Sequence, residues 1–181
     1  MKTLSTISDN DFKNLITIRF NNISEGLENF SNGILEPSDI SLSFEENQNK
    51  FLNFFRKSLS ANDNYVIIDF YLKNLSPEEI LTLLNSLDKN NKIILLQELK
   101  NLKTDSIYFS LDCNSLMDFI TILNTQNLFF CTVYFKEHPL TIWGNYDLKF
   151  PVFFNDIDSL NIYKEIATTC GLAINSIVIK K

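Results

Sequence analysis

The residues of this sequence that could do nucleophilic or acid–base chemistry are few and far apart. There is one histidine, His138, and of the three cysteines Cys113 and Cys131 are the nearest to it along the chain. A cysteine and a histidine would form a nucleophile and its base, because such partners need only be close in space. Cys131 lies within an apolar run, however, and a free cysteine there is typical of a core. A Cys–His enzyme is therefore an alternative rather than the favoured interpretation.

Carboxylates are plentiful but scattered, and one of them is unusual. Asp69 interrupts the apolar stretch 65–72, where a charge must be paired or lie at an edge. We interpret it as an edge or surface-facing residue, with an acid of raised pKa as the functional alternative. Acidic pairs such as Glu78-Glu79 stand at expected helix starts, where negative charge favours the helix dipole.

The motifs of nucleotide-dependent and serine-hydrolase chemistry are absent from the sequence, and four glycines leave little material for a phosphate-binding loop. The cysteines form no Cys-x-x-Cys pair, and one histidine is too few for a zinc site. We therefore expect no cofactor and no metal. The net charge is −6, and acidic residues outnumber basic ones in both halves of the chain. This balance argues against binding to nucleic acid.

The chain shows neither a secretory signal nor a membrane segment. Its first residues, 1–12, lack the apolar core of a signal peptide, and no apolar run reaches the length that spans a bilayer. We expect a cytoplasmic protein that does not bind a membrane.

Aromatic residues are concentrated in segment 128–154, which also holds the only tryptophan. Such a cluster is either dense core or a surface kept apolar for contact, since large rings dominate the energetics of both. A tryptophan and a tyrosine flank a Gly-Asn turn here, and acidic neighbours would complement a basic partner. The predicted partner-binding residues are Trp143, Tyr146, Asp147, Glu137 and His138. The alternative is that the tryptophan closes the end of a sheet.

Apolar spacing predicts an α-rich half over residues 1–104, with one or two strands. Helix starts are expected at Ser8, at Ser43 with Glu46, and at Ser76-Pro77-Glu78-Glu79. The elements expected in this half are one or two helices over 12–34, a strand over 39–44, a helix after Ser43, a buried strand over 65–72, and helices after Ser76 and over 92–102.

The second half, 105–181, alternates strands and helices. Its expected elements are strands over 106–111 and 128–135, a hairpin of 140–143 with 148–154, a last strand over 172–179, and helices over 115–125 and 156–169. We interpret this order as β-α-β-β-α-β, a ferredoxin-like split βαβ with a mixed or antiparallel sheet. The predicted fold is α+β, with the N-terminal α-rich half packed on this sheet in one compact unit. Phe130, Thr132 and Tyr134 should face the N-terminal helices.

These observations favour a non-enzymatic protein-binding module. Few reactive groups, negative charge and a local aromatic cluster fit an acidic inhibitor, of the immunity type, that neutralises a basic toxin or nuclease. A regulatory domain that binds a small ligand between the sheet and the N-terminal helices is the second hypothesis, and the Cys–His enzyme is the third.

Overall fold

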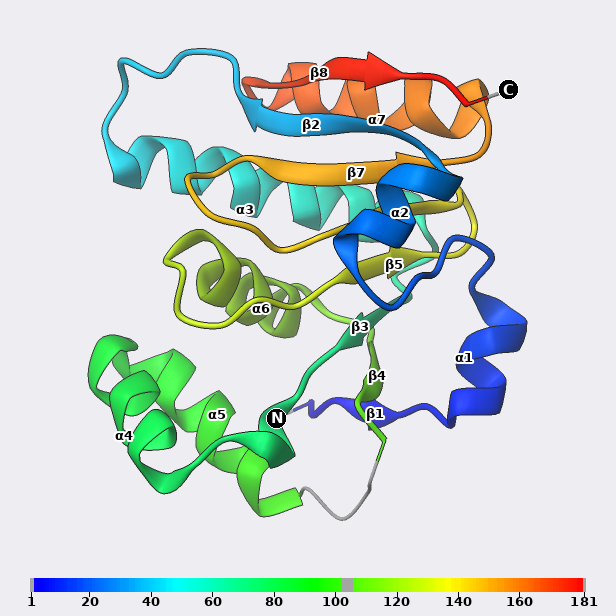
Figure 1. The fold of residues 1–181 in the computed structure, drawn as a ribbon. Coiled ribbons are helices and arrows are strands. Elements are labelled where there is room, and N and C mark those ends of the chain that lie inside the picture. The colour runs from blue at the N-terminus through cyan, green and yellow to red at the C-terminus, as the bar shows by residue number, and fades with distance from the viewer. Residues whose placement is uncertain (1, 102–105, 181) are drawn as a thin grey trace.

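The computed structural model describes residues 2–101 and 106–180, and within these residues eight strands form one open antiparallel sheet (Figure 1). Its strand order is β1-β4-β3-β5-β6-β7-β2-β8. The strands are β1 (Ser5–Thr6), β2 (Ser31–Pro37), β3 (Val66–Asp69), β4 (Tyr108–Leu111), β5 (Val133–Phe135), β6 (Leu140–Ile142), β7 (Phe150–Phe154) and β8 (Leu172–Val178). The predicted α+β class is confirmed.

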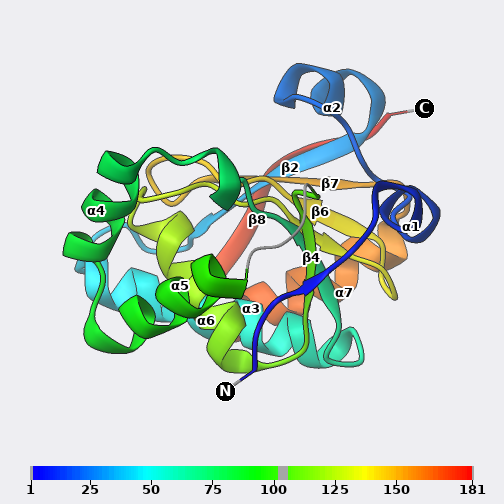
Figure 2. The same ribbon diagram turned by 90° about the horizontal axis from the view of Figure 1, so that it is seen from below.

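The helices lie on both sides of this sheet. Helices α3, α6 and α7 cover one face, and α2 lies on the opposite side (Figure 2). The pair α4 and α5 continues the helical layer beyond α6 (Figure 1). The helices are α1 (Asp9–Leu15), α2 (Ile23–Asn29), α3 (Phe44–Ala61), α4 (Pro77–Ser86), α5 (Lys89–Asn101), α6 (Asn114–Thr125) and α7 (Ile157–Thr169), with a 3₁₀ turn η1 (Leu72–Asn74).

The helix starts predicted from capping residues are confirmed. Ser8 caps α1 by accepting from the backbone N–H of Asp11. Helices α3 and α4 each begin with a complete capping box, formed by Ser43 with Glu46 and by Ser76 with Glu79. In each box two backbone N–H groups that have no partner within the helix gain one, so the local sequence is enough to set the boundary.

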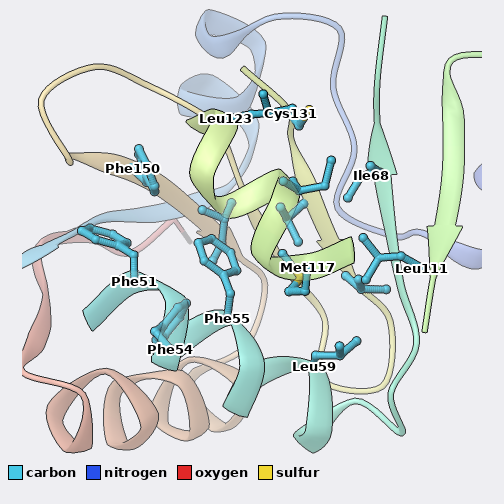
Figure 3. Packing of buried hydrophobic residues seen from close by; sticks show 14 of the residues in the cluster. Phe51, Phe54, Phe55, Leu59, Ile68, Leu111, Met117, Leu123, Cys131 and Phe150 are labelled. Carbon is cyan, nitrogen blue, oxygen red and sulfur yellow. The ribbon is translucent and has the colours of Figure 1, made fainter. Parts of the chain in front are cut away.

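The main core lies between the sheet and the helices α3, α6 and α7. Phenylalanines of α3 meet aliphatic and sulfur-containing residues of α6 and the inward side chains of the strands (Figure 3). Much of the aromatic cluster of segment 128–154 belongs to this core or to the strands beside it. At most 2% of the residue surface is exposed in Phe135, Phe150, Phe153 and Phe154.

The opposite face is covered in part by the N-terminal residues, as predicted for Tyr134, whereas Phe130 packs against Tyr146. The Phe12 ring of α1 stacks on Tyr108 with centroids 3.7 Å apart and meets Tyr134 edge-on at 4.9 Å. Ile16 and Ile67 complete this second, smaller cluster. The rings on this face of β4 and β5 are therefore packed beneath α1.

The ferredoxin-like order β-α-β-β-α-β is not confirmed. Three strands, β5, β6 and β7, separate α6 from α7. The strands joined by α6 flank β3, and those joined by α7 flank β2. Both inserted strands come from the first 104 residues of the chain, so the sheet is interleaved from early and late segments. The boundary between residues 104 and 105 lies outside the described residues, as does the end of the helix predicted over 92–102.

Three predicted elements differ from the structure, and for the first of them the cause is tertiary strand pairing. Residues 31–37, read as the end of a helix, form the strand β2 between β7 and β8. Gly33 lies at a register shift of this strand, where a Cβ would be 3.1 Å from the Asn175 carbonyl oxygen. Residues 39–43 form a loop rather than a strand, and the strand predicted over 128–135 is limited to Val133–Phe135.

Candidate functional site

The five predicted partner-binding residues lie at the two ends of β6 and do not form one site. In the register of β5 and β6, Phe135 is opposite Leu140 and Val133 is opposite Ile142. The turn 136–139 is therefore at one end of the pair, and Trp143 follows the other end. Glu137 and His138 belong to the turn, whereas Tyr146 and Asp147 lie in the β6–β7 loop with the tryptophan.

The turn that holds Glu137 and His138 is fixed by its backbone. The His138 N–H donates to Asn62 Oδ1 at 3.2 Å, and its carbonyl accepts from the Tyr163 hydroxyl at 2.8 Å. Glu137 is exposed and pairs with Lys136 at 3.1 Å. The backbone of His138 thus belongs to a structural network.

The cysteines of the Cys–His alternative are placed in different surroundings. Cys131 precedes β5 and His138 follows it, so an extended strand separates them. Cys131 is fully buried, and burial raises the pKa of its thiol, which disfavours the reactive thiolate. Cys113 caps α6, with its Sγ 3.3 Å from the Ser115 hydroxyl oxygen.

At the other end of β6, the β6–β7 loop lines a cleft that we call the Asp69 cleft. Its volume is about 310 Å³, at the small end of the range for ligand sites. Three segments line it: the end of β3, the residues before β5, and the start of the loop. The lining residues are Asp69, Tyr71, Phe130, Cys131, Thr132, Trp143, Gly144, Asn145 and Tyr146.

The floor of the cleft is held by side chains that replace strand partners. The Asn124 side chain accepts from the Cys131 N–H at 2.8 Å and donates to the Cys131 carbonyl at 3.0 Å. The Thr132 N–H donates to Asp69 Oδ1 at 2.5 Å. The Thr132 carbonyl still accepts from the Asp69 N–H at 3.2 Å, and the regular ladder begins at Val133. A Cβ on Gly144 would lie 2.6 Å from Asn124 Oδ1, so the loop approaches the floor only with glycine there.

Asp69 is buried, contrary to its interpretation as an edge or surface-facing residue. It is 6% exposed because β3 lies between β4 and β5 rather than at an edge of the sheet. Loss of water raises the pKa of its carboxyl to about 6, and hydrogen bonds from Thr132 and Tyr134 offset part of that effect. Within the described residues, no lysine, arginine or histidine forms an ion pair with it.

Aromatic rings surround this carboxylate, and two of them are well exposed. Tyr146 is 61% exposed and packs edge-on against Phe130, with centroids 4.6 Å apart. Tyr71 is 40% exposed. Trp143 stacks on Phe20 at 5.5 Å, which fixes the indole against the N-terminal segment. Tyr71 and Phe130 were not among the predicted residues, and the sequence signal that pointed to this place was the charge within the apolar stretch 65–72.

Comparison with models of protein families, with curated proteins and with solved structures finds no match to this chain. In the part of the chain that the structure describes, no helix has both the length and the apolar content to cross a membrane. The same residues hold no group of three His, Cys, Asp or Glu side chains that could bind a metal ion. The Asp69 cleft and its surroundings are therefore the candidate functional site.

Proposed function

We propose that this chain is a non-enzymatic protein-binding module that binds a basic partner protein with the surface around Trp143 and Tyr146. One observation carries the proposal. The two rings line a cleft whose floor holds a buried carboxylate without a cationic partner among the described residues. Large rings with polar tips supply stiff contact area, and a carboxylate beside them selects positive charge.

The charge of the whole chain supports the same class of partner. With a net charge of −6, the chain would attract a basic protein over distances beyond direct contact and raise the rate of encounter. Within this class we propose an inhibitor of the immunity type, which neutralises a basic toxin or nuclease by covering its surface. The binding surface comprises Trp143, Tyr146 and Asp147 with the Asp69 cleft, while Glu137 and His138 lie at the other end of β6.

A photo-crosslinking amino acid at position 146 tests this proposal in cells of the source organism. Position 40 provides the matched control, because Ile40 is also a large apolar residue and is 86% exposed. We expect crosslinks from position 146, but not from position 40, to a protein with a high isoelectric point, and we expect high salt to reduce them. A neutral or acidic partner, or equal capture from both positions, would contradict the proposal.

The immunity-type role has its own test. The captured partner, expressed alone, should arrest growth, and co-expression of this chain should restore it. Tyr146→Ala should weaken the rescue, whereas Ile40→Ala should leave it unchanged. A partner that is harmless when expressed alone would rule out the immunity-type role and leave the binding surface in place.

A further inference from the structure

We infer that the Asp69 cleft is the receptor for a single arginine side chain, whose guanidinium pairs with the Asp69 carboxylate. The inference rests on the proposed function, because the arginine would belong to the basic partner protein. Guanidinium is the chemical group that is recognised, and Asp69 is the residue that recognises it.

The carboxylate has hydrogen-bond donors around it but no cationic partner among the described residues. Its Oδ1 accepts a short hydrogen bond from the Thr132 N–H, at 2.5 Å. Its Oδ2 accepts from the Tyr134 hydroxyl at 3.3 Å, which is long for a bond between two oxygens. The Thr132 hydroxyl and the Asp69 N–H also contribute hydrogen bonds, so every donor around this carboxylate is neutral. A buried acceptor of this kind gains most from a donor that is itself charged.

The rings beside Asp69 favour guanidinium over ammonium. Tyr71, Trp143 and Tyr146 line the same cleft, and the faces of such rings attract cations. Guanidinium is planar, stacks on aromatic rings and is more weakly hydrated than an ammonium group. It therefore loses less hydration free energy on entering a half-buried site. Asp69 is the only carboxylate among the lining residues, and none of them is a lysine or an arginine. The cleft therefore carries the charge that an arginine needs and no cation that would repel it.

The cleft is also formed before a ligand arrives. The Trp143 ring is held by its stack on Phe20, and Tyr146 is held edge-on against Phe130. The floor is fixed by the paired hydrogen bonds between Asn124 and Cys131. Because few groups must be ordered on binding, even a short arginine-containing peptide should bind measurably.

The fluorescence of Trp143 provides the test, since it is the only tryptophan in the chain. Three capped tripeptides serve as probes, with arginine, lysine or citrulline between two glycines. Citrulline has nearly the shape of arginine but no charge. We expect a saturable fluorescence change with the arginine peptide, binding at least threefold weaker with lysine, and no binding with citrulline. Equal binding of the arginine and citrulline peptides would overturn the inference.

Two variants with the same change of charge distinguish binding in the cleft from general electrostatic attraction between the peptide and an acidic protein. Asp69→Asn should weaken binding of the arginine peptide at least tenfold. Asp63→Asn removes the same charge from an exposed turn before the other end of β3, and asparagine suits its φ of 54°. This control should bind like the wild type. Equal loss in both variants, or none in Asp69→Asn, would contradict the inference, and circular dichroism verifies that both variants fold.

Failure of this inference differs from failure of the proposed function. If the peptides do not bind but position 146 still crosslinks to a basic protein, the function stands and the arginine receptor is wrong. If the arginine peptide binds through Asp69 but no basic protein is captured, the receptor stands and the proposed function is wrong.

Discussion

Two buried polar clusters lie at opposite ends of the short strands β5 and β6, and they differ in charge. At the turn 136–139, the Asn62 amide donates to the Ser58 carbonyl and to the Tyr163 hydroxyl, at 2.8 and 3.0 Å. The same amide accepts from the His138 N–H, and the hydroxyl donates to the His138 carbonyl. This cluster is neutral, and the side chains of Asn62 and Tyr163 have partners for both donors and acceptors.

The cluster at the other end is charged. Asp69 is 6% exposed and accepts hydrogen bonds from Thr132 and Tyr134, which are neutral donors, with no ion pair to any described residue. Asp69 is one of the residues that line the cleft. A neutral, satisfied network stabilises a fold, whereas a buried charge without a partner lowers its stability. We therefore propose that the Asn62 cluster serves the fold and the Asp69 cluster serves binding.

The largest expected effect is the loss of the neutral cluster in Asn62→Leu. The change leaves the His138 N–H and the Ser58 carbonyl without their side-chain partner. We expect the free energy of unfolding to fall by roughly 3 kcal/mol, as two buried groups lose their partners. Urea denaturation measures this, and the folded fraction should still bind the arginine peptide. A loss below about 0.5 kcal/mol, the range of neutral surface changes, would show that this cluster is not what holds the turn.

Local sequence predicted those elements whose boundaries are set by neighbouring residues. The capping boxes of Ser43 and Ser76 and the apolar stretch 65–72 gave α3, α4 and β3, because their partners lie within a few residues. The strand β2 was not predicted, because its apolar residues continue the helical spacing of residues 12–30. Only its pairing with β7 and β8, more than a hundred residues later, makes it a strand.

The candidate site was predicted only in part, for the same reason. Trp143 and Tyr146 were predicted from residue type, since large rings with polar tips beside a turn are typical of interfaces. The place of Asp69 could not be found, because whether β3 is an edge strand depends on the order of the whole sheet. The short length of β5 could not be predicted from local pattern either, because the Asp69 side chain that binds Thr132 lies 63 positions earlier in the sequence.

The second prediction tests the charged cluster through stability. Because the carboxyl pKa in the folded protein is about 6, above its ordinary value of 3.8, the folded state holds more protons than the unfolded state between these values. The loss of folding stability caused by ionised Asp69 is therefore absent below about pH 4, grows as the pH rises, and is complete above about pH 7. The pKa difference corresponds to about 3 kcal/mol. We expect Asp69→Asn to be more stable than the wild type by about 2 kcal/mol at pH 8, because asparagine loses part of the hydrogen bonding that the carboxylate accepts.

Denaturation of both proteins across this pH range isolates the effect. Burial also raises the pKa of Glu98, but that group is common to the two proteins and cancels in their difference. The difference should shrink as the pH falls from 7 to 4. An Asp69→Asn variant that is less stable than the wild type at pH 8 would mean that the carboxylate serves the fold, and the contrast between the two clusters would then fail.

The third prediction concerns the floor of the Asp69 cleft. In Gly144→Ala the added Cβ would lie 2.6 Å from Asn124 Oδ1 and 2.9 Å from the Cys131 carbonyl oxygen. Both atoms take part in the paired bonds of the floor and cannot move without breaking them. We expect the free energy of unfolding to fall by about 1–2 kcal/mol, as in other overpacked sites, with weaker binding of the arginine peptide. Chemical denaturation and Trp143 fluorescence measure the two effects. Unchanged stability would show that the floor can shift.

The smallest change in stability is expected at Tyr146, where the binding effect should be clearest. Its ring is 61% exposed and its described ring contact is with Phe130, so Tyr146→Ala should alter the free energy of unfolding by less than about 0.5 kcal/mol. Loss of one ring beside the cation should weaken binding of the arginine peptide roughly threefold to tenfold, the range of one cation–π contact. Because Asn62→Leu should do the reverse, the two variants together test whether stability and binding belong to opposite ends of β5 and β6. A Tyr146→Ala variant that binds the peptide like the wild type would remove this ring from the receptor.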